Sequence, residues 1–152
     1  MGIQRHKKPP RVILVAEDDD EDFYLLRCAL ATSRMRLLLC QVRNGKQVME
    51  YLEGLSVYHD RNRFPEPDLL ILDLKMPIMD GFDVLAALRR CPHFANLPVV
   101  VMSGSNIPDD RVTAMALGAR GFYVKSASPQ SRKTLAQICR TWLKGKAANK
   151  GE

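Results

Sequence analysis

Charged and polar residues follow directly after several short apolar runs of this 152-residue chain. Asp73 ends the apolar run Leu69–Leu72 and is followed by Lys75-Met76-Pro77 and by the turn Asp80-Gly81. Short apolar runs bounded by turn residues are typical of buried strands in a parallel sheet. Because the reactive crevice of an open α/β sheet lies beyond the carboxyl ends of its strands, Asp73 is a candidate for chemistry.

A run of acidic residues, Glu17–Asp22, follows another apolar run, Val12–Ala16. Such a run is usually the solvated start of a helix, and some of its members can cap that helix and complement its dipole. The first two, Glu17 and Asp18, lie at the strand end itself, where carboxylates would repel Asp73 unless a positive charge lies between them. A hard cation such as Mg²⁺, held by carboxylates and water, meets this requirement.

Two further strand ends bring a hydroxyl and an ammonium group. Ser103 ends the run Leu97–Met102, and Lys125 ends the run Gly121–Val124. Each has a simple alternative explanation, as a turn serine or a surface lysine. Together with the carboxylates they fit phosphoryl transfer to Asp73, which would be the nucleophile. A metal ion would neutralise the phosphoryl oxygens, and the hydroxyl and ammonium groups would bind the others.

The elements that would position these side chains follow a regular alternation. Apolar runs of strand length lie at residues 12–16, 37–42, 69–72, 97–102 and 121–124. Segments with the apolar spacing of a helix lie at residues 23–30, 48–55, 82–88, 112–116 and 135–143. Strands and helices in alternation predict an α/β fold, with a parallel sheet covered by helices on both faces. The longest predicted loop, residues 56–68, is polar and contains two prolines.

Length and composition indicate one globular domain in a reducing compartment. The chain is long enough to bury one continuous core. No segment approaches the roughly 18 apolar residues of a membrane span, and the basic start has no secretory h-region. The four cysteines are far apart in the sequence, which favours buried, reduced thiols. We therefore expect a cytoplasmic protein without membrane partners.

The net charge of +6 is located in the two ends of the chain. Residues 1–11 carry a net charge of +4 and residues 144–152 a net charge of +2, so residues 12–143 are neutral. A neutral body gives little support for a nucleic-acid-binding face. We expect residues 1–10 and 144–152 to be basic, solvated and disordered tails, with one domain over residues 11–143.

Taken together, the motifs make residues 11–143 resemble the CheY-like receiver domains of two-component response regulators. Four motifs match in the family's order: Val15–Asp18, Leu72–Pro77 with Asp80-Gly81, Val101–Ser105 and Phe122–Lys125. The resemblance implies a flavodoxin-like, doubly wound sheet of five parallel strands in the order 2-1-3-4-5, with five helices.

The resemblance also implies a role for each candidate residue. Asp73 would be the phosphoacceptor, Lys125 the phosphate-binding lysine, Ser103 the switch hydroxyl and Phe122 the switch aromatic residue. Mg²⁺, for which Mn²⁺ can substitute, would be bound by Glu17, Asp18, Asp73 and the main-chain carbonyl of Lys75. In such a switch, Ser103 moves toward the phosphoryl group, Phe122 fills the space, and the surface of the fourth and fifth helices changes.

Three positions depart from the family pattern. Lys75 replaces the Asn found in many receivers, although its expected metal contact is made by the main chain. Phe122 replaces the commoner Tyr, which excludes a switch that hydrogen-bonds through a phenol. Ser126 follows the lysine where the family usually has Pro; because cis peptides are largely confined to proline, the sequence leaves the Lys125–Ser126 isomer open.

The function implied is that of a stand-alone response regulator of a phosphorelay, which catalyses only its own phosphorylation and dephosphorylation. Its partners would be a sensor histidine kinase or phosphotransfer protein and a downstream protein target. The loop at residues 56–68 and the pair Trp142-Leu143 resemble stand-alone receivers that serve bacterial phytochromes. Homodimerisation through the fourth and fifth helices, or through the last helix, is compatible with the resemblance.

Three other functions share part of this residue pattern. The first is a receiver fold used as an interaction module that is never phosphorylated. The second is a phosphatase with an Asp nucleophile, which is disfavoured because Lys75 occupies the position of its general acid. The third is a flavodoxin-like cofactor binder, which is disfavoured because the acidic run Glu17–Asp22 would repel an unmetallated phosphate.

Overall fold

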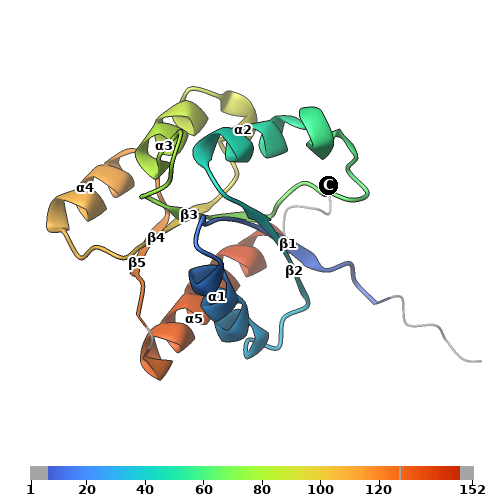
Figure 1. The fold of residues 1–152 in the computed structure, drawn as a ribbon. Helices are drawn as coiled ribbons and strands as arrows, with labels where there is room; N and C mark the ends of the chain where they lie inside the picture. Colours follow the sequence, from blue (N-terminus) through green and yellow to red (C-terminus); the bar gives the residue numbers. More distant parts are fainter. Residues whose placement is uncertain (1–6, 127, 148–152) are drawn as a thin grey trace, which may run out of the picture.

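The chain folds into one sheet of five strands flanked by five α-helices (Figure 1), in a computed structural model that describes residues 7–126 and 128–147. The strands are β1 (Arg11–Ala16), β2 (Leu37–Val42), β3 (Leu69–Asp73), β4 (Val99–Ser103) and β5 (Gly121–Val124). The α-helices are α1 (Asp20–Ala31), α2 (Gly45–Glu53), α3 (Gly81–Arg89), α4 (Pro108–Ala116) and α5 (Pro129–Ala147). Two 3₁₀ turns, η1 (Ser56–His59) and η2 (Pro92–Phe94), follow α2 and α3.

The sheet has the order β2-β1-β3-β4-β5, and every neighbouring pair of strands is parallel. This order confirms the predicted doubly wound, flavodoxin-like fold. In the register, Asp73 pairs with Met102 and Ser103 pairs with Val124. The carboxyl ends of β3, β4 and β5 therefore lie level at one edge of the sheet, where β1 also ends.

Helices cover both faces of the sheet and enclose two hydrophobic cores (Figure 1). Residues of α1 and α5 form one core, and residues of α2, α3 and α4 form the other. Successive strand residues face opposite cores: Leu14 and Leu70 face α2, α3 and α4, whereas Ile13 and Ile71 face α1 and α5. Because the central strands are buried on both faces, their sequences are continuous apolar runs rather than alternating ones.

The segment between α2 and β3, predicted as a polar loop, is packed by an aromatic cluster. The rings of Tyr51, Tyr58 and Phe64 contact one another with centroids 5.1–6.1 Å apart. The guanidinium of Arg61 donates hydrogen bonds to the carbonyl oxygens of Tyr51 and Phe64, at 2.8 and 3.3 Å. A third hydrogen bond, of 3.0 Å, reaches another carbonyl at the end of α2. Arg61 thus adds a charged donor to two carbonyls in the last turn of α2, one of which, that of Tyr51, also accepts a hydrogen bond from the Gly54 amide at 3.2 Å.

Replacing Arg61 with alanine is expected to lower the free energy of unfolding by about 1–3 kcal/mol, because several partly buried carbonyls lose a charged donor. Arg63 is the matched control, since it is exposed and its guanidinium lies 5.6 Å from the Phe64 ring centroid without a hydrogen bond or ion pair to the other described residues. Urea denaturation of both alanine variants measures the difference. Equal stability of the two variants would contradict the capping role.

The ends of the domain differ in part from the predicted boundaries. Helix α5 continues to Ala147, past the predicted boundary at Leu143, because neither proline nor a turn interrupts it there. The C-terminal range predicted as a tail therefore begins as helix. At the other end, the carbonyl of Lys8 accepts a hydrogen bond from Arg36 at 2.9 Å. The remaining parts of the predicted tails, residues 1–6 and 148–152, lie outside the described residues.

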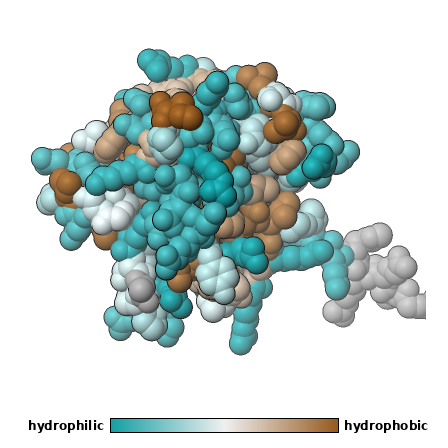
Figure 2. Space-filling model, viewed as in Figure 1, coloured by the Kyte–Doolittle hydropathy of each residue, from teal (hydrophilic) through white to brown (hydrophobic). Residues whose placement is uncertain are grey.

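The surface seen in Figure 2 is mostly hydrophilic, with hydrophobic residues in separate patches. Large exposed apolar side chains include Ile78 after β3 and Ile107, Val112 and Met115 at or in α4. Over the part of the chain that the structure describes, no helix has the length and apolar character needed to cross a bilayer.

Candidate functional site

The predicted site residues converge at the edge of the sheet where β1, β3, β4 and β5 end. Glu17 and Asp18 follow β1, Asp73 is the last residue of β3, Ser103 is the last residue of β4, and Lys125 follows β5. Parallel strands bring these ends together because their carboxyl ends all lie at the same edge. The structure thus places side chains from distant parts of the sequence at one location.

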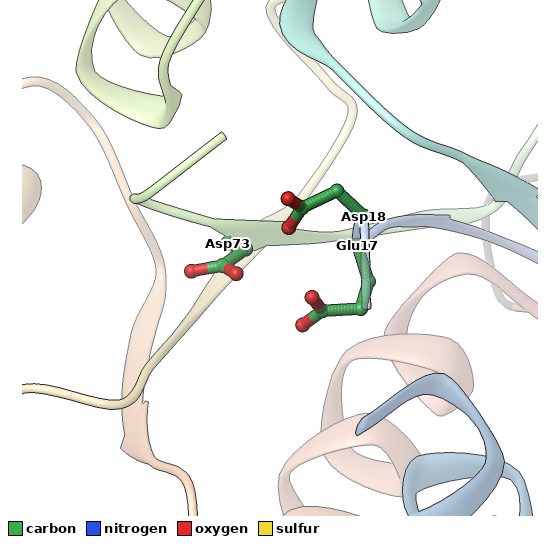
Figure 3. A group of neighbouring side chains, drawn as sticks. All are labelled: Glu17, Asp18 and Asp73. Atoms are coloured by element: carbon green, nitrogen blue, oxygen red, sulfur yellow. The ribbon is translucent and has the colours of Figure 1, made fainter. Parts of the chain in front are cut away.

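Three carboxylates form the centre of the site (Figure 3). Glu17, Asp18 and Asp73 each offer an oxygen atom that lies within 4.8 Å of the other two. Glu17 and Asp73 are buried, with 0% and 5% of their surface exposed, whereas Asp18 is exposed. Figure 3 shows the three side chains extending to the same side, beyond the ends of β1 and β3. The cluster is therefore embedded in the protein but open to solvent at Asp18.

Lys125 supplies the positive charge beside these carboxylates. Its Nζ atom lies 2.5 Å from Glu17 Oε2 and 3.0 Å from Asp73 Oδ2. It also lies 2.8 Å from Oδ2 of Asp22, in the first turn of α1. One ammonium group thus contacts three carboxylates, one just after β1, one in α1 and one at the end of β3.

Asp22 was not among the residues that the sequence predicted for the site. The members of its acidic run have different roles. Asp19 caps α1 by accepting a hydrogen bond from the Asp22 amide at 2.9 Å. Asp20 forms an ion pair with Arg43 at 2.6 Å. Glu21 is exposed. The acidic run was the only sequence signal for Asp22, because which member faces β5 depends on how α1 crosses the sheet.

Burial and neighbouring charges shift the ionisation of two site residues. Burial raises the pKa of Glu17 to about 7, with a further increase from the Asp73 charge, against lowering by Lys125 and by the Asp19 amide. Burial lowers the pKa of Lys125, but its contacts with Asp22, Glu17 and Asp73 outweigh burial and raise that pKa overall. Lys125 therefore stays positively charged, whereas burial destabilises the ionised form of Glu17.

The raised pKa of Glu17 gives a testable pH dependence. Between its unfolded and folded pKa values, 4.5 and about 7, the native state binds more protons than the unfolded state, so stability falls as pH rises through this window. In the wild type the free energy of unfolding should fall by on the order of 1–3 kcal/mol between about pH 5 and pH 8, and Glu17→Gln is expected to remove this decrease. Urea denaturation in a chelator measures it.

Asp20→Asn is the control for this experiment. Hydrogen bonds from Arg43 and Gln41 lower the pKa of Asp20, so its contribution is lost only as pH falls below the window used for Glu17. In the Asp20→Asn variant, the free energy of unfolding should fall with pH across this window as steeply as in the wild type. A Glu17→Gln variant with an unchanged slope would contradict the assignment.

The donor atoms of the site fit a hard divalent cation. Within the described part of the chain, Glu17 Oε2 is the one buried side-chain oxygen that lacks a hydrogen bond; its short contact with Lys125 is an ion pair without hydrogen-bond geometry. A buried carboxylate oxygen in this state, next to two further carboxylates, is the kind of ligand that Mg²⁺ and Mn²⁺ prefer. Lys75 contributes main chain to the same place, because its amide donates a hydrogen bond to Asp73 Oδ1 at 3.1 Å.

The end of β3 is held in position by a close approach of α3. Asp80 caps α3, and the amide of Gly81 donates a hydrogen bond to the carbonyl of Leu74 at 3.0 Å. A Cβ atom on Gly81 would lie 2.4 Å from the carbonyl oxygen of Asp73. Only glycine therefore lets the helix start directly against the residue that carries the central carboxylate.

Ser103 and Phe122 lie on the α4 side of the site. Ser103 is fully buried, and its Oγ accepts a hydrogen bond from the Ser105 amide at 3.1 Å. Phe122 is half-buried in the core that α4 shares, with the Arg111 guanidinium 5.9 Å from its ring centroid. Phe122 in β5 thus faces the core that α4 shares, and Ser103 lies at the end of the neighbouring strand β4.

The peptide bond between Lys125 and Ser126 is trans, since no cis bond occurs in the described residues. The amide of Lys125 donates a hydrogen bond to the carbonyl of Ser103 at 2.7 Å, which joins the ends of β4 and β5. This settles the question that Ser126 left open in the sequence. The lysine reaches the carboxylates without the proline that usually follows it in the family.

Comparison with known proteins places this geometry in a family. The family model of the response regulator receiver domain matches residues 13–137. Among curated proteins, the response regulator Rcp1 of Synechocystis sp. is 35% identical over 118 residues, which is 78% of this chain and 78% of that protein.

Solved structures give the same result. The phosphorylated cyanobacterial phytochrome response regulator RcpA is similar with a TM-score of 0.79 and 33% identity, over 89% of this chain and 95% of that one. The Mn²⁺-bound form of response regulator Rcp1 is similar with a TM-score of 0.77 and 32% identity, over 88% of this chain and 95% of that one. With this family match and the shared α/β fold, the chain belongs to the CheY-like receiver domains of two-component response regulators.

Proposed function

We propose that this chain is a response regulator that accepts a phosphoryl group on Asp73 from a histidine kinase or a phosphotransfer protein. The observation that carries the proposal is the position of Asp73, whose carboxylate lies 3.0 Å from the Lys125 ammonium and within 4.8 Å of Glu17 and Asp18 oxygens. In the transfer, an Asp73 oxygen forms a bond to phosphorus while the bond from phosphorus to the donor's nitrogen or oxygen breaks.

The other residues of the site act on the charge of the incoming group. Mg²⁺ or Mn²⁺, bound by Glu17, Asp18, Asp73 and the main-chain carbonyl of Lys75, would supply positive charge to the phosphoryl oxygens. Lys125 holds a second positive charge next to the acceptor oxygen. Without such charges, four acidic side chains within reach of one another would repel a phosphoryl anion.

The readout that we propose runs from Ser103 through Phe122 to α4. A phosphoryl group on Asp73 offers an acceptor to the Ser103 hydroxyl, and movement of Ser103 changes the packing around Phe122 and Arg111. The exposed apolar side chains Val112 and Met115 on α4 support a protein partner for this surface. A downstream protein, or a second copy of the chain, would then recognise the phosphorylated form.

The phosphodonor that we propose is a phytochrome-linked histidine kinase. The similarity to RcpA, which is a phytochrome response regulator, supports this class of partner. The proposal also includes that the chain has no catalytic activity on other substrates, acts in the cytoplasm and binds no nucleic acid, in keeping with the neutral charge of residues 12–143.

Incubation of the purified chain with acetyl phosphate and Mg²⁺ tests the proposed function. We expect the mass of one phosphoryl group to appear on the intact protein, to be absent when a chelator is present from the start, and to be lost on chemical cleavage of the acyl phosphate. Persistent absence of labelling, with acetyl phosphate and with a panel of phosphorylated histidine kinases, would favour an interaction module that is never phosphorylated.

A further inference from the structure

Asp22 differs from the other two carboxylates that contact Lys125. Glu17 and Asp73 belong to the carboxylate cluster that fits a divalent cation, whereas Asp22 does not. Its Oδ2 atom lies 2.8 Å from Lys125 Nζ, and 39% of its side chain is exposed. We infer that Asp22 is a positioning residue that retains the Lys125 ammonium when a divalent cation occupies Glu17 and Asp73. The inference rests on the cation site of the proposed function.

A cation in the cluster changes the surroundings of Lys125. An ammonium group has three N–H donors, and in this structure its three carboxylate neighbours match them in number. A dication bound to Glu17 and Asp73 would draw electrons from both carboxylates and repel the ammonium group directly. Lys125 then needs an anionic partner outside the cluster, within reach of its present position.

Asp22 can act as this anionic partner of Lys125. A cavity of about 230 Å³ between α1, β5 and α5 is lined by apolar side chains together with Asp22, Lys125, Tyr123, Ser126 and Arg132. Asp22 is the acidic residue of this lining, and the charge of Arg132 would not stabilise a second cation. Among the described residues that line this cavity, Asp22 is therefore the one with which Lys125 can keep an ion pair when it shifts away from the cluster.

The carboxylate of Asp22 has no part in capping its helix. The cap of α1 uses the Asp22 amide, which donates to Asp19 Oδ1, and Asn at position 22 would retain this bond. Asp22→Asn therefore removes the ion pair with Lys125 and leaves the helix start intact. Glu21 provides a matched control, since it lies in the same turn, is exposed and has no ion pair with other described residues.

Titration of the full chain with Mn²⁺, followed by calorimetry, tests the inference. Asp22→Asn is expected to weaken Mn²⁺ binding about three- to tenfold, because the cation-bound state then leaves the ammonium group without its partner. Glu21→Gln, which removes the same charge without touching Lys125, should change the affinity by less than about twofold. Asp22→Glu, which keeps the carboxylate, should bind Mn²⁺ more tightly than Asp22→Asn. Equal effects of Asp22→Asn and Glu21→Gln would overturn the inference.

A double-mutant cycle separates the role of Asp22 from its charge alone. In a Lys125→Ala background there is no ammonium to retain, so adding Asp22→Asn should weaken Mn²⁺ binding no more than Glu21→Gln does. An undiminished effect of Asp22→Asn in that background would overturn the inference and indicate a direct action on the cation. A wild-type chain that binds no Mn²⁺ would instead refute the cation site itself, while labelling of Asp73 remains a separate measurement.

Discussion

Replacing Asp73 with asparagine is expected to abolish phosphoryl labelling of the chain by acetyl phosphate, with a loss of more than about 100-fold in initial rate. The amide has nearly the shape of the carboxylate and still accepts a hydrogen bond at Oδ1 from the Lys75 amide. It cannot form an acyl phosphate, and it leaves Lys125 with Glu17 and Asp22 as anionic neighbours. The change therefore removes the acceptor and preserves the fold around it.

Intact-protein mass spectrometry with and without acetyl phosphate measures this loss. Asp20→Asn is the matched control, because Asp20 is exposed, pairs with Arg43 and does not contact Lys125 among the described contacts. The control should be labelled at the wild-type rate. Labelling of Asp73→Asn at that rate would show that another residue is the acceptor and would remove the basis of the proposed function.

Removal of one carboxylate from the cluster is expected to have the second largest effect. Asp18→Asn should weaken binding of Mg²⁺ or Mn²⁺ by at least about 10–100-fold, the loss known for outer partners of a metal site. Asp18 is exposed, so this variant should fold as the wild type does. Labelling at low Mg²⁺ should fall in parallel, and a large excess of the cation should restore most of it.

The measurement is the initial labelling rate as a function of Mg²⁺ concentration. Glu21→Gln removes one charge from the same acidic run without touching the cluster, so its curve should lie close to that of the wild type. A chelator should abolish labelling in all variants. If labelling of the wild type persisted in the chelator, the charge of the cluster would have to be compensated in another way than by a divalent cation.

These two variants together separate a phosphorylated response regulator from an unphosphorylated interaction module. Both functions require the same fold and the same exposed apolar residues on α4, such as Val112. Only the first requires the acceptor oxygen of Asp73 and the cation ligands to act together. Suppose that both variants lose labelling but still bind the partner as the unphosphorylated wild type does. The α4 surface would then determine which partner binds, and the carboxylate site would regulate that binding.

The sequence by itself determined the architecture and the centre of the site. Apolar runs alternating with helical spacing require a parallel sheet, and in such a sheet the residues after each strand must share one edge. For this reason Glu17, Asp18, Asp73, Ser103 and Lys125 could be predicted to lie together, and they do. The physical basis is local: each residue had only to be placed at the end of its own strand.

Only the tertiary structure decided how side chains outside the strand ends meet. Asp22 and Lys125 are 103 residues apart, and their contact depends on the angle at which α1 crosses the sheet, which no periodicity records. The packing of Arg61 against the end of α2 likewise depends on the path of a loop between two elements. The alternation of strands and helices follows from patterns repeated along the chain, and the strand order was implied by the resemblance to receiver domains, whereas such contacts are fixed by the packing of whole elements against one another.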